Sequence, residues 1–404
     1  MLNSNLETWL FSILSLFIPF FPKMLPLIII LIALVLFYKF FNQKQSGSNY
    51  AHLMLPQQLL IILFLMYLIG MTYSENLHFG WKDIEAKLSF IVFPILFIII
   101  EIRRIKVDFK KVFLFFIIGC LISLSLNIYE GLICYYNSSS PSIACFLGSS
   151  FTYNMHVNHI SIYYATAILL LFAIEINKIL KTTLLIAFGF SIILFMSLGA
   201  FIAILFAGIF ILFLYRKHIK KLSLVVFIAL AAAFLLAATS FFELRNDYFN
   251  MYKGIDSKKE LYFRANRYSE SILTRIVVWD VALGKIIQNP FGVGTGDVKD
   301  VLIDEYHTLG LTKMERQKLN PHNQFLQTGV SIGLLGVLAL LSMLILTIRR
   351  GIRRNNFLLS GFAVLITVNM LFESFLEIQA GIIFSSLFIF LLDMDARRLT
   401  NRNI

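Results

Sequence analysis

The sequence has little charge. Only 14% of its 404 residues are Asp, Glu, Lys or Arg, whereas 58% are hydrophobic, and the mean hydropathy is +0.80. Soluble globular domains have about a quarter of their residues charged, so this composition excludes a water-soluble protein. The apolar excess also excludes an intrinsically disordered chain, because such chains lack the side chains to bury. The sequence therefore predicts an all-α integral membrane protein.

Several common functional signatures are also absent. The chain has no Walker-type lysine, no Gly-x-Ser-x-Gly turn and no His-Glu-x-x-His pair. No apolar run has an ionisable residue near its middle and none looks like a broken helix, which argues against an ion-coupled transporter. Gly292-x-Gly294-x-Gly296 resembles a phosphate loop, but it follows a helix and not a strand, so we interpret it as a flexible turn.

The apolar residues fall into about twelve segments that could cross a membrane, since about 30 Å of hydrocarbon needs roughly 20 helical residues. These segments cover residues 8–22, 24–41, 55–73, 88–102, 112–130, 159–176, 182–198, 199–215, 222–240, 324–348, 357–372 and 378–395.

Basic residues gather in alternate connections, and the positive-inside rule assigns those connections to the cytoplasm. They are Lys39, Lys44, Arg103, Arg104, Lys106, Lys110, Lys111, Lys178, Lys181, Arg216, Lys217, Lys220, Lys221, Arg349, Arg350, Arg353, Arg354, Arg397, Arg398 and Arg402. Both termini are then cytoplasmic. Most of the net charge of +12 reflects topology, so we expect no nucleic-acid partner.

This topology divides the chain into three parts. Residues 1–240 hold the first nine spans, 241–321 form one long extramembrane segment, and 322–404 hold the last three spans and a cytoplasmic tail. A structureless loop of that length is improbable, so we expect a small helical subdomain, with helices near 268–289 and 311–319. In the other long outer connection, Cys134 and Cys145 are close enough in sequence to form a disulfide but are not required to.

His322 is the sharpest candidate for chemistry. It follows Pro321, a residue that suits the first turn of a helix, so we place His322 and its neighbour Asn323 at the outer N-terminus of the 324–348 span. There the helix dipole favours the neutral imidazole, the form required of a general base, and free N–H groups suit a phosphate. The alternative is an interfacial histidine that only caps the helix.

Arg275 and Trp279 lie four residues apart on the helix predicted before it, so they share one face. The guanidinium could rest on the indole, or it could bind a diphosphate through two parallel hydrogen bonds. The alternative is a solvated surface arginine. Arg264 and Arg267 are weaker candidates of the same kind.

Two further pairs lie at outer helix ends. His156 and His159 open the 159–176 span, where they could hold a metal, although interfacial polar side chains are the simpler interpretation; we assign His159 to substrate binding. Glu373 and Glu377 lie four apart near the last outer turn and could add a carboxylate to the same face, or they could be ordinary loop charges.

Taken together, these motifs resemble the O-antigen ligase/polymerase superfamily of bacterial envelopes. The resemblance is carried by Arg275-Ile-Val-Val-Trp279, Asn289-Pro-Phe-Gly-Val-Gly294, Pro321-His-Asn-Gln-Phe-Leu326 and Gly333-Leu-Leu-Gly336. The stretch 82–94 and the tail Glu373-Ser-Phe-Leu-Glu377 are also similar to members of this family. The resemblance implies a GT-C-like fold in the bacterial inner membrane, with about twelve spans and a periplasmic loop before the histidine.

The resemblance also implies an activity: inverting, metal-independent glycan transfer with no cofactor. The donor would be an undecaprenyl-diphosphate-linked glycan and the acceptor a lipid A–core hydroxyl, within membrane lipid. O-antigen polymerase and protein O-oligosaccharyltransferase are alternatives, and a lipid-linked saccharide flippase is the alternative from another class. The family's essential histidine matches His322, and one of its diphosphate-binding arginines matches Arg275.

The sequence departs from the family at one position. Where the family has a second arginine, in Ser-Arg-Gly-Ala, this chain has Leu198 within Ser197-Leu-Gly-Ala200. Either Arg264, Arg267 or Arg245 supplies the missing charge, or this member works differently.

Overall fold

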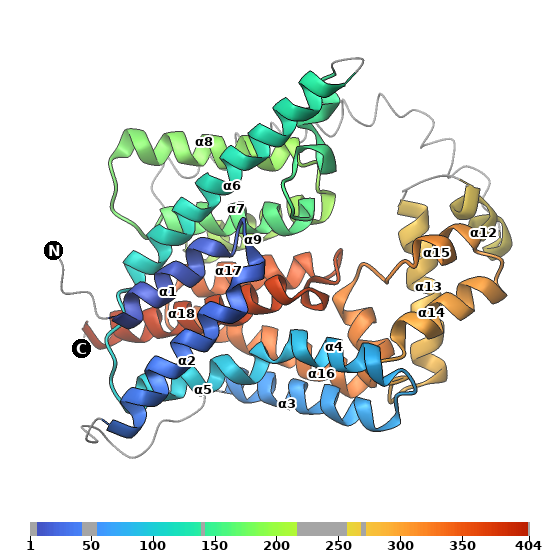
Figure 1. Ribbon diagram of the computed structural model, residues 1–404, viewed down its shortest axis with the longest axis horizontal. Helices are drawn as coiled ribbons and strands as arrows, with labels where there is room; N and C mark the ends of the chain where they lie inside the picture. Colours follow the sequence, from blue (N-terminus) through green and yellow to red (C-terminus); the bar gives the residue numbers. More distant parts are fainter. Residues whose placement is uncertain (1–5, 43–54, 139–141, 216–256, 268–271, 403–404) are drawn as a thin grey trace.

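The computed structural model describes residues 6–42, 55–138, 142–215, 257–267 and 272–402. Within these ranges every element is helical, as predicted (Figure 1). Each predicted span contains a helix except 222–240, which lies outside the described residues. The elements of the bundle are α1 (Leu6–Phe17), η1 (Pro22–Met24), α2 (Leu25–Asn42), α3 (Leu55–Gly70), η2 (Met71–Tyr73), α4 (Leu77–Lys87), α5 (Ser89–Ile102), α6 (Phe109–Asn137), η3 (Ile143–Phe146), η4 (Gly148–Phe151), α7 (Val157–Leu171), α8 (Lys178–Leu194), α9 (Leu198–Tyr215), α16 (Gln324–Arg353), α17 (Phe357–Asn369), η6 (Phe375–Glu377) and α18 (Gln379–Arg402).

In the described part of the chain, five helices are long and apolar enough to cross a membrane. They are Pro22–Asn42, Pro56–Tyr73, Phe109–Asn137, Leu198–Tyr215 and Gln324–Arg353. Shorter apolar helices, such as α7 and α17, accompany them. The protein is therefore an integral membrane protein, and the number of twelve spans stays a prediction.

The centre of the bundle is α18. From Ala380 to Asp393 its side chains are buried on all sides, as expected for a helix that is apolar all round. Aromatic contacts hold it in place: the ring of Phe390 stacks on Phe97 of α5 at 4.9 Å, and Phe384 stacks on Phe116 of α6 at 5.8 Å. The last helix therefore packs against protein and gives the loop before it, residues 370–378, a rigid support.

The long loop forms a helical subdomain beside one end of the bundle (Figure 1). Its helices are α12 (Lys258–Arg267), α13 (Ile272–Gln288), α14 (Val298–Thr308) and α15 (Thr312–Gln317). A separate apolar core joins α13 to α14 and α15, with Val277, Leu302 and Met314 fully buried. The described helices α13 and α15 confirm the two predicted ones, whereas α12 and α14 were not predicted.

The Gly-rich turn after α13 contacts α16, and this contact differs from two of our expectations. The helix α16 is broken at Ile332 and Gly333, where Gly333 has φ +74°, so a broken helix is present after all. The turn after α13 fills the break: Val293 and Gly294 donate to the carbonyl oxygens of Val330 and Ser331 at 2.8 and 3.0 Å. Backbone groups freed by the break are thus satisfied, and the turn is a fixed contact and not a loose one.

Cys134 and Cys145, whose pairing the sequence leaves open, form a disulfide that ties the end of α6 to η3. In Figure 1 the start of α1 and the end of α18 lie at the end of the bundle opposite α12–α15. This arrangement agrees with termini on one side of the membrane and the loop subdomain on the other.

Candidate active site

The site is built around the segment between α17 and α18. Gln324, the first residue of α16, binds this segment twice: its backbone N–H donates to the carbonyl oxygen of Met370 at 2.8 Å, and its side-chain oxygen accepts from the N–H of Leu376 at 2.6 Å. The segment 370–376 is therefore locked against the start of α16, which is the position of the predicted histidine.

His322 contacts Glu373 in this segment. Its Nδ1 lies 3.3 Å from Oε1 of Glu373, whose side chain is buried, while the imidazole is partly exposed. The histidine has φ +46°, a left-handed conformation that is uncommon for a residue with a side chain, and its N–H bonds the side chain of Asn320 at 3.0 Å. The backbone thus aims the imidazole at the carboxylate while leaving part of the ring accessible.

The helix start differs from the prediction in detail. Asn323, and not His322, is the N-cap of α16, because its side-chain oxygen accepts from the N–H groups of Phe325 and Leu326. Pro321 lies before the cap and outside the helix. The interpretation of His322 as a capping residue is therefore wrong, and the amide oxygen of Asn323 is used in the fold.

The carboxyl group of Glu373 has an altered acidity. Burial raises its pKa, but the hydrogen bond from His322, together with the charges of His156 and His159, outweighs burial and brings the pKa below its ordinary value. Glu373 is therefore ionised at neutral pH. A buried carboxylate on Nδ1 favours the tautomer in which Nδ1 carries the proton and Nε2 has a free lone pair.

Arg275 and Trp279 reach the same place from α13. Nη1 of Arg275 donates to the carbonyl oxygen of Phe372 at 3.0 Å, and the indole Nε1–H of Trp279 donates to the carbonyl oxygen of Pro321 at 2.8 Å. The two side chains have separate partners, so the predicted stacking of guanidinium on indole is not what holds them. Arg275 and His322 thus contact adjacent residues, Phe372 and Glu373.

The remaining predicted residues are placed less centrally. Arg264 forms an ion pair with Glu260 on its own helix. The side chain of Arg267 and the whole of Arg245 lie outside the described residues. Gly199 packs so closely on Phe372 that a Cβ atom added at position 199 would lie 2.6 Å from the Cβ of Phe372. The neighbouring residue, Leu198, therefore lies beside the site and brings no charge to it.

His159 lies in the first turn of α7. Its ring is 2% exposed and stacks on Phe375 with ring centroids 4.5 Å apart. Among the described residues, no group of three His, Cys, Asp or Glu side chains has the geometry to hold a metal ion.

Lys87 and Glu377 form a buried network that sequence reasoning missed. The ammonium of Lys87 lies 2.5 Å from Asp83 and 3.4 Å from Glu377, and Glu377 also accepts from Gln324 at 3.0 Å. Burial lowers the pKa of Lys87, but the charges of Asp83 and Glu377 raise it by a larger amount. The pKa of Lys87 therefore lies above its ordinary value. The network ties α4 to the segment that holds Glu373. The sequence drew attention only to the four-residue spacing of Glu373 and Glu377, and nothing in it indicated the contact with Lys87.

A histidine directed at a buried carboxylate and an arginine therefore lie together at one end of the helix bundle. Residues 183–341, which include Arg275 and His322, match the family model of O-antigen ligase (Wzy_C). No curated protein matches the chain. The chain is thus a helical membrane protein in which residues 183–341 are similar to the O-antigen ligase family, and the activity of that family is glycan transfer of the ligase or polymerase type.

Proposed function

We propose that the protein transfers a glycan from undecaprenyl diphosphate to an acceptor hydroxyl on the periplasmic face of the inner membrane, as an O-antigen ligase acting on lipid A–core. The observation that carries this proposal is the convergence of Arg275 and His322 on the adjacent residues Phe372 and Glu373. A base and a cation held at one spot are what a transfer from a diphosphate requires.

In this scheme His322 is the general base. With the Nδ1 proton held by Glu373, Nε2 takes the proton of the acceptor hydroxyl. The acceptor oxygen forms a bond to the anomeric carbon from the face opposite the diphosphate, and the bond from that carbon to the diphosphate oxygen breaks. The configuration inverts, the undecaprenyl diphosphate leaves, and the proton stays on His322 until solvent removes it.

Arg275 compensates charge on the leaving group. One guanidinium nitrogen is held by the carbonyl oxygen of Phe372, which fixes the planar group and leaves other N–H donors for phosphate oxygens. Diphosphate is a good leaving group once its charge is met, so the scheme needs no metal and predicts full activity in excess EDTA. Leu198 contributes no charge, and Arg264, Arg267 and Arg245 stay candidates for a second cation.

Two observations support a periplasmic site. The site lies in connections that the distribution of Lys and Arg assigns to the outer side. The disulfide between Cys134 and Cys145 lies in another of these connections, and disulfides persist in oxidising compartments such as the periplasm.

The decisive variant is His322→Ala. It should abolish transfer while the protein is still inserted, because the imidazole is partly exposed and its loss leaves no large cavity. His307→Ala is the matched control: His307 also has Nδ1 on a glutamate, Glu315 at 3.1 Å, but on the exposed surface of the loop subdomain. Full activity of His322→Ala would remove this residue from the mechanism.

The acceptor decides between the related activities. Analysis of envelope lipopolysaccharide in a deletion strain separates them: core without polymer, with lipid-linked polymer accumulating, means ligase. A core that bears a single repeat means polymerase. Intact lipopolysaccharide with unglycosylated protein means protein O-oligosaccharyltransferase.

The alternative from another class is a lipid-linked saccharide flippase. The break in α16 at Gly333 favours it, since transporters use broken helices at their binding sites. Reconstituted vesicles test it: a flippase moves the donor between leaflets without an acceptor, whereas the proposed transferase consumes the donor only when an acceptor is present.

A further inference from the structure

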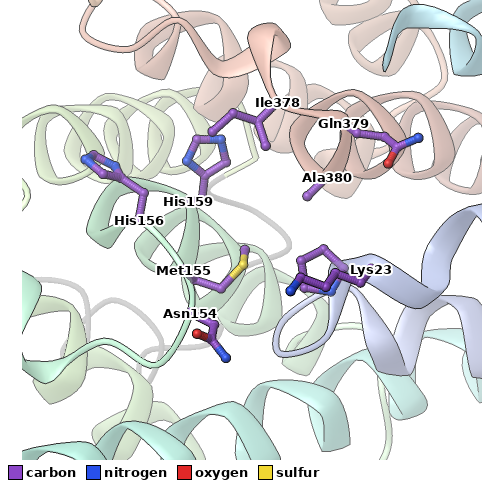
Figure 2. Close-up of a pocket in the computed structure, with 9 residues that line it drawn as sticks. Lys23, Asn154, Met155, His156, His159, Ile378, Gln379 and Ala380 are labelled. Carbon is purple, nitrogen blue, oxygen red and sulfur yellow. The ribbon is translucent and has the colours of Figure 1, made fainter. Parts of the chain in front are cut away.

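A pocket of about 260 Å³ opens beside the candidate active site and is not used by the proposed mechanism. Its walls come from η1, from the residues that lead into α7, and from the start of α18 (Figure 2). All three segments lie in connections that the charge distribution assigns to the outer face. The pocket is small for a drug-sized ligand but large enough for a headgroup fragment.

The polar groups in the pocket are donors or neutral groups. In Figure 2, His156 and His159 lie across the pocket from Lys23, and amides at Asn154 and Gln379 border it. No carboxylate is among the lining residues. An ammonium that faces imidazoles and amides attracts an anion with several acceptor oxygens.

His159 has ring nitrogens that a ligand in the pocket could hydrogen-bond. Neither ring nitrogen has a hydrogen-bond partner, although the ring is 98% buried; the backbone of Phe375 is near but outside hydrogen-bond geometry. Leaving a buried imidazole without a partner is destabilising, so such a group is rare unless something binds it. In the pocket a ligand oxygen can supply the missing bond.

The rest of the wall is apolar. Pro22, Met155, Ile378 and Ala380 complete the lining, so the anion's neighbour in the ligand should also be apolar. A phosphate attached to a hydrocarbon chain has this composition, and a free saccharide does not.

We infer that this pocket binds a phosphate monoester, with Lys23 and His159 as its main polar contacts. Because Phe375, which stacks on His159, is two residues from Glu373, the pocket and the candidate active site share one segment. The binding of such a ligand does not depend on the proposed function.

Native mass spectrometry of the full-length protein tests the inference, with phosphatidic acid as the probe and phosphatidylcholine, a zwitterionic phosphate diester of no net charge, as the competitor. The wild type should retain phosphatidic acid preferentially. Lys23→Gln and His159→Gln should each reduce this preference about tenfold, the value of one charge-assisted hydrogen bond. Lys23 is exposed, so its variant should fold normally even where the buried histidine variant does not.

Two controls make the result specific. Lys299→Gln removes another exposed lysine, in the loop subdomain, and should keep the preference. His322→Ala should keep it too while losing transfer, which separates this inference from the proposed function. Competition by inorganic phosphate at similar concentration would identify free phosphate as the ligand, and its failure would identify a lipid headgroup. The inference is overturned if Lys23→Gln and His159→Gln retain phosphatidic acid as the wild type does.

Discussion

The contact between Glu373 and His322 makes the sharpest prediction. If the carboxylate holds the Nδ1 proton, its removal lets the imidazole rotate or adopt the other tautomer, and Nε2 is then no longer a ready base. Because Glu373 acts through His322 and does not touch the acceptor in this scheme, the loss should appear in kcat and not in KM.

The geometry sets the size of the effect. A hydrogen bond to a charged group contributes about 1.5–3 kcal/mol, and 1.36 kcal/mol is tenfold in rate, so Glu373→Ala should lower kcat about 10- to 150-fold. In Glu373→Gln a neutral acceptor remains, which is worth about 1 kcal/mol, so the loss should be about 2- to 30-fold.

The assay is transfer of a labelled glycan from undecaprenyl diphosphate to lipid A–core by the purified protein. Glu315→Gln is the matched control, since it changes the same atoms of a His–Glu pair on the exposed loop surface and should leave kcat within about twofold. Since the pKa of Glu373 lies below its ordinary value, the carboxylate is ionised at the neutral pH of the assay.

Two results would contradict this reasoning. If Glu373→Gln and Glu315→Gln had the same kcat, the contact with His322 would have no catalytic value. If Glu373→Gln raised KM and left kcat at the wild-type value, the residue would act in binding and not through His322.

Three further substitutions test the supports of the site. Gly333→Ala should lower the free energy of unfolding by about 1–3 kcal/mol, because φ is +74° and the new Cβ would lie 2.3 Å from a carbonyl oxygen. Gly284→Ala, where a Cβ meets nothing within 4 Å, should be neutral or stabilising by scanning fluorimetry. Lys87→Met should cost about 3–5 kcal/mol, since it leaves carboxylates buried without a cation, whereas Lys285→Met, at a more exposed pair, should cost about 1; equal shifts in melting temperature would refute the distinction. Arg275→Lys should lower kcat/KM about tenfold without changing melting, because a point charge does not replace the planar guanidinium; unchanged kinetics would exclude a bidentate role.

Helix positions could be predicted from the sequence because they depend on local composition. Apolar runs of sufficient length become helices in a membrane, whatever their neighbours are. Secondary structure in the long loop was harder to predict from the sequence. The apolar spacing of α13 is regular, whereas α14 has three acidic residues among the buried side chains of Val298, Leu302 and Tyr306, and these obscured its helical pattern in the sequence.

Which residues meet was predictable only in part. Charge and topology placed Arg275 and His322 on one face, and the structure brings them to adjacent residues; their catalytic roles remain predictions. Glu373 was noticed only as an outer carboxylate, because nothing in one sequence pairs positions 51 residues apart. The left-handed backbone at His322 and Gly333 is likewise set by tertiary contacts, which residue types alone do not reveal.

The break in α16 has a physical reason that bears on function. At Gly333 the helix comes so close to the turn after α13 that only glycine fits, and Leu334 donates across the break to the carbonyl oxygen of Pro290 at 2.9 Å. A transporter's break exposes backbone to an ion or a substrate, but here the freed groups are bound to the loop subdomain. The break therefore fixes α13, and with it Arg275, relative to the start of α16 and His322. A transferase needs this fixed geometry, because its base and its cation must meet one substrate bond at the same time.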